Sequence, residues 1–283
     1  MIVQLRISDA RLDELIAEDV PYIDLTTHIL GMGDVPGAIE YFTRETCILC
    51  GSEEVARMMK RLGLTIEHVL PSGTPLEPGQ TFLKAKGNAV DLHAAWKVCL
   101  NVFDHCSAVA TKTRTMVDAA HAGNPECQVL TTRKSMPGSK ILFTKAIMTG
   151  GALPHRLGLS ETVLVFAQHI EFMGGFEAFV DALPDIRQRC ADKSLVVEAN
   201  GAQALTLARA GVDAIQFDKV PSEQLTPLVY ELRAIDPYIT LIAAGGVNPQ
   251  NAAEYAATGV DALATTALFT AKPVDMGVRM LSG

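Results

Sequence analysis

The chain has 283 residues, of which 48% are hydrophobic and 20% charged, and its formal net charge is −8. This length and composition allow two modest domains or one barrel with an extension, and they exclude wholesale disorder. An acidic chain without a long Lys/Arg run is poorly suited to nucleic acid, because phosphate neutralisation supplies most of that affinity. Any anion site must therefore be a local basic cluster on an acidic surface.

The start of the chain does not resemble a secretion signal. No apolar run reaches the ~20 residues that cross a bilayer. The first residues, MIVQLRISDARLDEL, mix charged and apolar positions and lack the basic start, apolar centre and cleavage site of a signal peptide. We therefore expect a cytoplasmic protein that binds neither membrane nor nucleic acid.

Six cysteines are scattered along the chain. Cys47 and Cys50 form a lone C-x-x-C in a stretch typical of a strand, where residues three apart point to opposite faces. Such a pair chelates metal badly, so we expect buried or half-buried thiols and assign no metal ligands.

The first part of the chain predicts helices and strands in mixed order. Residues 8–18 predict a helix with Ser8 or Asp9 as its N-cap, and the Pro-interrupted residues 19–30 predict a loop. The other predicted elements are strands within 37–50 and over 81–87, a helix over 52–62 capped by Ser52, turns over 71–80, and a long helix over 88–122, broken at most once.

The later part alternates apolar runs with amphipathic helices. The predicted strands are 127–132, 162–166, 194–198, 213–217, 239–243 and 261–264. The predicted helices are 138–150, 175–190, 201–210, 221–235 and 248–258. Strands that are apolar throughout are buried on both faces, and alternation with helices predicts parallel pairing.

A barrel and a doubly wound sheet both satisfy this pattern. The absence of G-x-G-x-x-G after the first strand disfavours a dinucleotide fold. We expect an incomplete α/β barrel, because only six strands are clear instead of eight. The proposed domains are 1–107, of α and β structure, and 108–283, the barrel, with the last residues returning to the first domain or packing beneath the barrel.

Reactive groups of barrels lie at the C-terminal ends of the strands. Arg133 and Lys134 follow the first barrel strand, where they can grip a carboxylate or phosphate or form a solvated surface pair. His155 and Arg156, near glycines, form a second cluster, although a lone histidine is more often structural.

Two carboxylates, Glu198 and Asp218, end neighbouring strands. They can hold a metal-bound diphosphate, face a developing positive charge, or pair with nearby cations. The loops after the last two strands, residues 244–248 and 265–267, resemble phosphate-binding loops, with Asn248 as a candidate N-cap, although such loops also serve only as turns. Together these groups suit a phosphorylated sugar and a carboxylated partner.

Residues 131–170, TTRKSMPGSKILFTKAIMTGGALPHRLGLSETVLVFAQHI, resemble the signature of the quinolinate phosphoribosyltransferase family. Further matches are DLTT at 24–27, AGVDAIQFDK at 210–219 and AAGGVNPQNAAEYAATGVDAL at 243–263. The resemblance covers nearly the whole chain in the right order. It is closest to the subgroup called ModD, pyrophosphorylases encoded with molybdate-transport genes.

The resemblance implies a fold and an activity. The fold is an N-terminal α/β sandwich plus an incomplete α/β barrel. The assembly is a homodimer or a higher oligomer, in which one subunit covers the barrel mouth of the other. The activity of the family is transfer of ribose 5-phosphate from phosphoribosyl pyrophosphate to quinolinate, with Mg²⁺ and loss of pyrophosphate and carbon dioxide. For this chain we expect a small, carboxylated aromatic acceptor and release of pyrophosphate.

The resemblance also implies roles for single residues. Arg133, His155 and Arg156 would hold the acid, and Lys134 would contact the donor and assist catalysis. Asp218 and Glu198 would be the carboxylates near the ribose. The remaining substrate-binding residues implied are Lys97, placed where the family has an arginine that reaches across the dimer, and Ala244, Gly245, Gly246, Thr265 and Thr266 of the phosphate loops.

Some positions depart from the family pattern. Phe166-Ala167-Gln168-His169 stands where the family reads Lys-Asp-Asn-His, and the family glutamate aligns with Ala199 unless a one-residue shift brings Glu198 into place. We therefore expect a planar acid other than quinolinate as the acceptor, or weak activity on quinolinate. The alternative is a non-catalytic anion- or nucleotide-binding sensor on the same fold.

Overall fold

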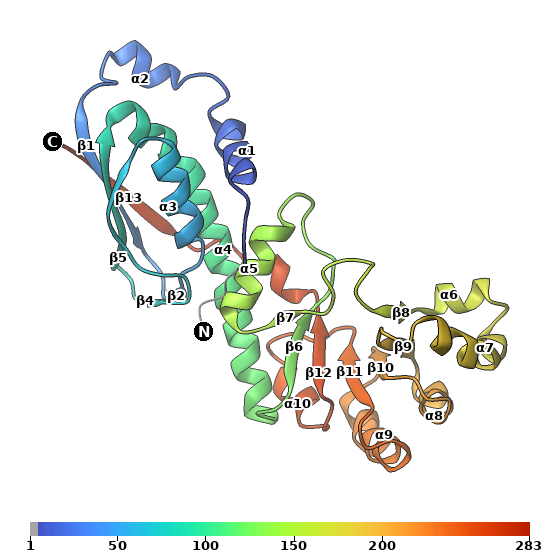
Figure 1. Ribbon diagram of the computed structural model, residues 1–283. Helices are drawn as coiled ribbons and strands as arrows, with labels where there is room; N and C mark the ends of the chain where they lie inside the picture. The colour runs from blue at the N-terminus through green and yellow to red at the C-terminus, as the bar shows by residue number, and fades with distance from the viewer. Residues whose placement is uncertain (1–4) are drawn as a thin grey trace. The chain divides into compact units, whose positions relative to one another are not determined.

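The computed structural model describes residues 5–283 of the chain. Residues 1–4, the start of the segment compared above with signal peptides, lie outside it. The chain forms two compact units (Figure 1). The N-terminal unit comprises the chain up to Arg114, Met136–Gly150 and Phe269–Gly283, and the barrel unit comprises Thr115–Ser135 and Gly151–Leu268. The domain boundary proposed at residue 107 stays a prediction.

The N-terminal unit is built on an antiparallel sheet of order β13-β1-β5-β3. Its strands are β1 (Pro36–Thr43), β3 (Thr65–Val69), β5 (Thr81–Asn88) and β13 (Met276–Ser282), with a small ribbon of β2 (Cys47–Ile48) and β4 (Pro75–Leu76). Its helices are α1 (Asp9–Asp19), α2 (Leu25–Leu30), α3 (Ser52–Arg61), α5 (Lys140–Gly150) and the first part of α4 (Ala89–Gly123). The end of the chain returns to this sheet, since β13 pairs with β1 from Gly37↔Ser282 to Thr43↔Met276.

One of the two helix N-caps predicted for the N-terminal unit is confirmed by the structure. The helix near residue 8 is confirmed, because the Ser8 side chain accepts from the Arg11 N–H at 3.3 Å. Ser52 as an N-cap is wrong: Gly51, at φ +101°, occupies that position and Ser52 is the first helical residue. The long helix α4 is unbroken over 35 residues.

The loop predicted over residues 19–30 is wrong in its second half, where α2 forms. The Asp24 carboxylate accepts from the N–H groups of Thr26 and Thr27 at 3.0 and 3.2 Å, which caps the start of the helix. Gly31, at φ +63°, ends it in the left-handed conformation. Local capping therefore stabilises a helix in a segment that its proline had led us to predict as a loop.

The barrel unit is an open parallel sheet of order β7-β6-β12-β11-β10-β9-β8. Its strands are β6 (Gln128–Thr131), β7 (Leu153–Pro154), β8 (Val163–Val165), β9 (Leu195–Ala199), β10 (Ala214–Asp218), β11 (Thr240–Ala244) and β12 (Ala262–Thr265). Its helices are α6 (Ala167–Phe172), α7 (Phe176–Arg189), α8 (Gly201–Arg209), α9 (Ser222–Ile235) and α10 (Ala252–Ala256), followed by the short η1 (Ala267–Thr270). The strands β8 to β12 neighbour each other in chain order, so the incomplete barrel is confirmed. Sequence analysis missed the two-residue β7 and the short α6.

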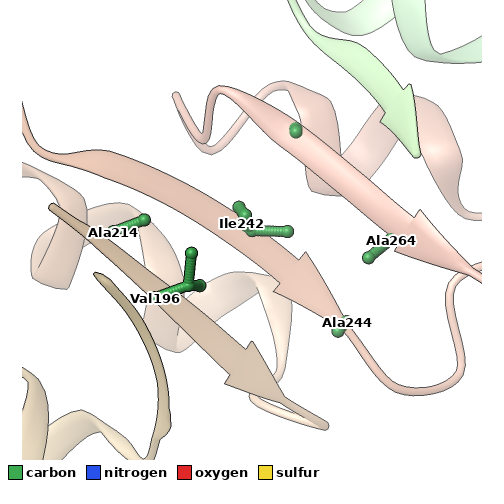
Figure 2. Packing of buried hydrophobic residues seen from close by; sticks show 6 residues of the cluster. Val196, Ala214, Ile242, Ala244 and Ala264 are labelled. Atoms are coloured by element: carbon green, nitrogen blue, oxygen red, sulfur yellow. The ribbon is translucent and has the colours of Figure 1, made fainter. Parts of the chain in front are cut away.

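One face of this sheet carries mainly small apolar side chains (Figure 2). Val196, Ala214, Ile242, Ala244 and Ala264 lie on it, each at most 5% exposed. They share the face because side chains alternate along each strand and the strands pair in parallel register. Alanines at these positions leave room above them at the C-terminal ends of the strands.

The described residues contain no helix that is both long and apolar enough to cross a bilayer. All six cysteines are buried free thiols, as predicted.

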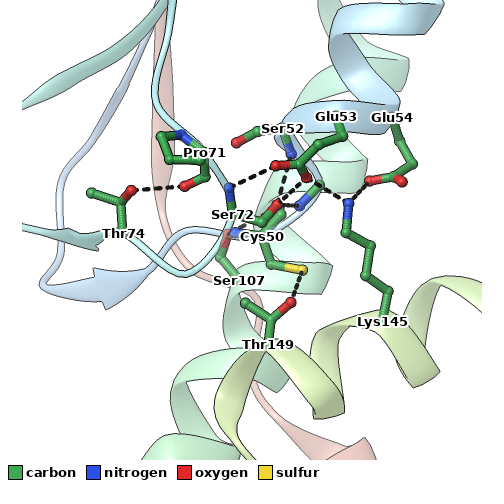
Figure 3. A network of polar contacts seen from close by, with 11 residues as sticks. Cys50, Ser52, Glu53, Glu54, Pro71, Ser72, Thr74, Ser107, Lys145 and Thr149 are labelled. Carbon is green, nitrogen blue, oxygen red and sulfur yellow. Dashed lines mark hydrogen bonds and ion pairs between the residues drawn. The ribbon is translucent and has the colours of Figure 1, made fainter. Parts of the chain in front are cut away.

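A buried ion network connects α3 and α5 within the N-terminal unit (Figure 3). The Lys145 ammonium contacts the carboxylates of Glu53, at 2.5 Å, and Glu54. The side chains of Lys145 and Glu54 are only 4% and 3% exposed. Removing one partner of such a pair leaves an uncompensated charge away from water, which is strongly destabilising.

Replacing Lys145 should therefore lower stability far more than replacing a surface lysine. We expect Lys145→Met to lower the free energy of unfolding by about 3–5 kcal/mol, since Glu54 keeps a buried charge. Lys86→Met is the matched control, because Lys86 pairs with Glu67 at the surface, where such pairs contribute about 0–1 kcal/mol. Urea unfolding followed by circular dichroism measures both. Equal losses of unfolding free energy in the two variants would contradict a stabilising role for the buried Lys145 ion pairs.

The same network predicts an acid dependence of stability. Burial alone would raise the pKa of Glu53, but hydrogen bonds from Lys145 and Ser72 outweigh it and lower this pKa to about 2. Glutamate in an unfolded chain titrates near pH ~4.3. Because the folded pKa is the lower one, the contribution of Glu53 is complete above pH ~4.3 and is lost as the pH falls towards 2. Glu53→Gln should flatten the fall of unfolding free energy across this window in urea titrations. An unchanged slope of unfolding free energy against pH in Glu53→Gln would contradict this role of Glu53.

Candidate active site

A cavity of about 430 Å³ opens at the C-terminal ends of the barrel strands. Its lining residues are Thr132, Arg133, Lys134, His155, Arg156, Leu164, Phe166, Glu198, Gln216, Asp218, Ala244, Gly245, Gly246, Val247, Asn248, Ala264, Thr265, Thr266 and Ala267. Each strand from β6 to β12 contributes at least one of them or the residue that follows it. Every site residue predicted from the sequence lines this cavity except Lys97.

One wall of the cavity is basic. Arg133 and Lys134 follow β6, and Arg156 follows β7 and donates from Nη1 to the Thr162 carbonyl at 3.4 Å. Burial, together with the charge of Arg133, lowers the pKa of Arg156. Neither Arg133 nor Lys134 forms an ion pair with any residue that the structure describes. The three cations therefore repel one another, which favours an anionic ligand.

His155 lies beside this wall with both ring nitrogens buried and without a partner among residues 5–283. Its backbone N–H donates to the Thr131 carbonyl at 2.9 Å, which fixes its place after β7. Burial, and then the charge of Arg156, lowers the pKa of His155, so its neutral form is favoured. A neutral imidazole offers a ligand one donor and one acceptor.

The floor of the cavity is acidic. Glu198 on β9 and Gln216 on β10 are register partners, and the Gln216 amide donates to the Glu198 carboxylate at 2.8 Å. Asp218 follows on the same face of β10 at the strand end. Burial, with added repulsion from Asp218, raises the pKa of Glu198 above its usual value despite the amide bond. Glu198 lines the cavity, whereas Ala199 does not.

Gly245 permits a close approach between the ends of β10 and β11. It has φ +79°, and a Cβ there would lie 2.4 Å from Asp218 Oδ1 and 2.7 Å from the Lys219 backbone nitrogen. Lys219 is itself at φ +57°, and its N–H donates to the Ala244 carbonyl at 2.8 Å. Only glycine fits this position without displacing Asp218.

The loop after Gly245 is held by side chains. The prediction of Asn248 as a helix N-cap is wrong, since α10 begins at Ala252 after Asn251. Asn248 instead accepts from the Gln250 N–H at 2.9 Å and donates to the Gly246 carbonyl at 3.0 Å, which makes a local turn. Because carbonyl groups hold the loop, the N–H groups of Gly245 and Gly246 take part in none of the described hydrogen bonds and are free for an anion.

Thr265 fastens the neighbouring loop, since its hydroxyl donates to the Val247 carbonyl at 2.6 Å and accepts from the Ala267 N–H at 3.0 Å. Thr266 follows it in the lining of the cavity. The two predicted phosphate loops thus lie together.

Sequence analysis missed Gln216 and Leu164 as site residues. Gln216 had a signal, because it is an amide in the middle of an otherwise apolar strand. Leu164 had none, since an apolar residue within a strand is typical of the core. Phe166, noted from the sequence only as a departure from the family pattern, also lines the cavity. Lys97 lies on α4, exposed, with its ammonium 4.5 Å from the centroid of the Trp96 ring.

Comparisons with known proteins agree with this architecture. The family description "Quinolinate phosphoribosyl transferase, N-terminal domain" matches residues 24–107, and the description of the C-terminal domain matches residues 109–279. The chain is 39% identical over 248 residues to ModD of Rhodobacter capsulatus, covering 87% of this chain and 95% of that protein. It is 36% identical over 275 residues to ModD of Pasteurella multocida, covering 97% and 98%. Both relatives are named pyrophosphorylases.

The fold resembles that of the nicotinate-nucleotide pyrophosphorylase from Francisella tularensis, with a TM-score of 0.88, 23% identity and 98% of each chain covered. Both domain descriptions match in order, and the two relatives are well above 30% identical over most of the chain. The chain belongs to the quinolinate phosphoribosyltransferase family, whose members are pentosyltransferases.

Proposed function

We propose that the protein transfers ribose 5-phosphate from phosphoribosyl pyrophosphate to a small carboxylated aromatic acceptor and releases pyrophosphate. The observation that carries this proposal is the division of one cavity into a basic wall, an acidic floor and a loop of free N–H groups. The basic wall suits the carboxylate of an acceptor, and the loop suits a phosphate. The floor suits a carbon that becomes positively charged.

The reaction breaks the bond between the ribose C1 and the pyrophosphate oxygen, and the electron pair leaves with the pyrophosphate. The acceptor's nucleophilic ring atom then forms the new bond to C1. Asp218 and Glu198 would stabilise the cation-like carbon, while Lys134 would stabilise the leaving group. Arg133, Arg156 and His155 would hold the acceptor by its carboxylate, and fixed orientation itself contributes to the rate.

Mg²⁺ would arrive with the diphosphate of the donor. Among the described residues no cluster of three or more His, Cys, Asp or Glu side chains could hold a metal ion. Two carboxylates plus phosphate oxygens are the donor set that Mg²⁺ usually takes, so the residues present fit the ion. Asp218 is the better ligand, because its side chain is 43% exposed whereas Glu198 already accepts from Gln216. The bound ion would neutralise charge on the diphosphate.

We further propose a homodimer or higher oligomer with a shared active site. Lys97, which lies outside the cavity of its own chain, would then contact substrate across the subunit interface. The association with molybdate transport stays a prediction, because no described side chain bears on it.

The decisive test is pyrophosphate release from phosphoribosyl pyrophosphate and Mg²⁺ with a panel of aromatic acids and bases. We expect release that depends on one class of acceptor. No release with any acceptor, while calorimetry still shows donor binding, would instead support the non-catalytic binding protein.

Arg133 and Asp218 should separate binding from turnover. Arg133→Ala should raise the Kd of the acid acceptor about 10–100-fold, because a hydrogen bond to a charged group contributes about 1.5–3 kcal/mol. Asp218→Asn should leave that Kd within about threefold and lower kcat about 10²–10³-fold, as loss of a charge-stabilising group does. Calorimetry and the release assay measure the two effects. Wild-type behaviour of both variants would show that the site is assigned to the wrong place.

Gly245 and Gly246 offer a matched pair of substitutions. Gly245→Ala should weaken donor binding at least tenfold, because its Cβ would collide with Asp218 and with backbone. Gly246→Ala should have a smaller effect, since at φ +86° it meets the same backbone strain but no atom lies within 4 Å of the added Cβ. Calorimetry with phosphoribosyl pyrophosphate compares them. A larger loss of donor affinity in Gly246→Ala than in Gly245→Ala would exclude a role for the close approach of Gly245 to Asp218.

A further inference from the structure

The walls of the cavity differ in chemistry. The lining contains three cations, Arg133, Lys134 and Arg156. It also contains an apolar wall, to which β8 contributes Leu164 and, just after its end, Phe166. Both residues of this apolar wall are half-buried. A ligand that fills the cavity therefore contacts both cations and hydrocarbon.

The Phe166 ring is held in place. Its backbone N–H donates to Nδ1 of His169 at 2.9 Å, and Phe166 forms the N-terminal boundary of α6. The two rings stack at 5.8 Å between centroids with an interplanar angle of 24°. The apolar wall is thus a fixed surface, against which a flat aromatic ring can pack.

This wall has nothing to offer a second carboxylate. Neither Leu164 nor the side chain of Phe166 can donate a hydrogen bond, and a charge buried without a partner is strongly disfavoured. In the proposed reaction Lys134 of the basic wall already serves the diphosphate of the donor. Glu198 and Asp218 on the floor would repel a further anion.

Resting on the proposed transferase function, we propose that Phe166 selects aromatic acids that carry a single carboxylate. The carboxylate lies at the basic wall, and the uncharged remainder of the ring lies against Phe166 and Leu164. The transfer then breaks only the C1–oxygen bond of the donor and forms only the bond from C1 to the acceptor. No carbon–carbon bond breaks, so the product keeps its carboxylate and no carbon dioxide is released.

The test compares pyridine-3-carboxylate with pyridine-2,5-dicarboxylate, which carries a second carboxylate across the ring from the first. Wild type should show at least tenfold higher kcat/KM for the monocarboxylate in the pyrophosphate assay, with no carbon dioxide released. Phe166→Lys supplies a cation at the apolar wall and should shift this ratio at least tenfold towards the dicarboxylate. Phe166→Leu, the matched apolar control, should keep the wild-type preference.

Binding measured by calorimetry separates this inference from the proposed function. If neither acid is turned over but the monocarboxylate binds at least tenfold more tightly, the transferase proposal fails and the selectivity of Phe166 stands. If wild type prefers the dicarboxylate and releases carbon dioxide, the transferase stands and the inference is overturned. The wild-type comparison decides this even where Phe166→Lys does not fold. An unchanged ratio in a folded Phe166→Lys also overturns it.

Discussion

The register of the parallel sheet is the constraint on which the whole site depends. Its strands are apolar and buried through most of their length, and the polar side chains that line the cavity lie in or beyond their C-terminal halves. The pairing of Glu198 with Gln216 places a carboxylate and an amide side by side, within hydrogen-bond distance. A slip of one residue would turn Glu198 to the other face and put Ala199 in its place. The small side chains beneath, such as Ala214 and Ala244, keep the space above the floor open.

The loop after β11 forms an anion site at the end of the paired strands β10 and β11. Lys219, in the left-handed conformation, and Gly245, at positive φ, bring the ends of β10 and β11 so close that no side chain fits between them. Non-glycine residues in that conformation cost free energy and persist where the surroundings fix them, often at functional sites. Asn248 and Thr265 then hold the loop through carbonyl groups. The N–H groups of the glycines are left for a ligand.

Much of this arrangement could be predicted from sequence, because it depends on two local patterns, the alternation of strands with helices and the polar residues at strand ends. Apolar runs alternating with helices gave the parallel barrel, and polar residues at strand ends gave all predicted lining residues but Lys97. The failures are also physical. The cap at Asp24 outweighed the single proline before α2, and the true helix boundary near Asn251 depends on turn hydrogen bonds that composition does not reveal. Phe166 stood out in the sequence only as a departure from the family pattern, and the fold was needed to show that it lines the same cavity as the three cations.

The two units treat charged side chains in opposite ways, and the contrast bears on function. Lys145 in the N-terminal unit is enclosed by two carboxylates, so its charge is satisfied by the fold itself. In the barrel unit, Arg133 and Lys134 have no carboxylate partner among the described residues, and both nitrogens of His155 are buried without one. A fold that pairs its charges in one place and leaves cations without a carboxylate partner in another favours binding of an anion at the second. The missing partner must be anionic at the basic wall and uncharged beside Phe166, and these two requirements together define the acceptor more narrowly than either wall alone.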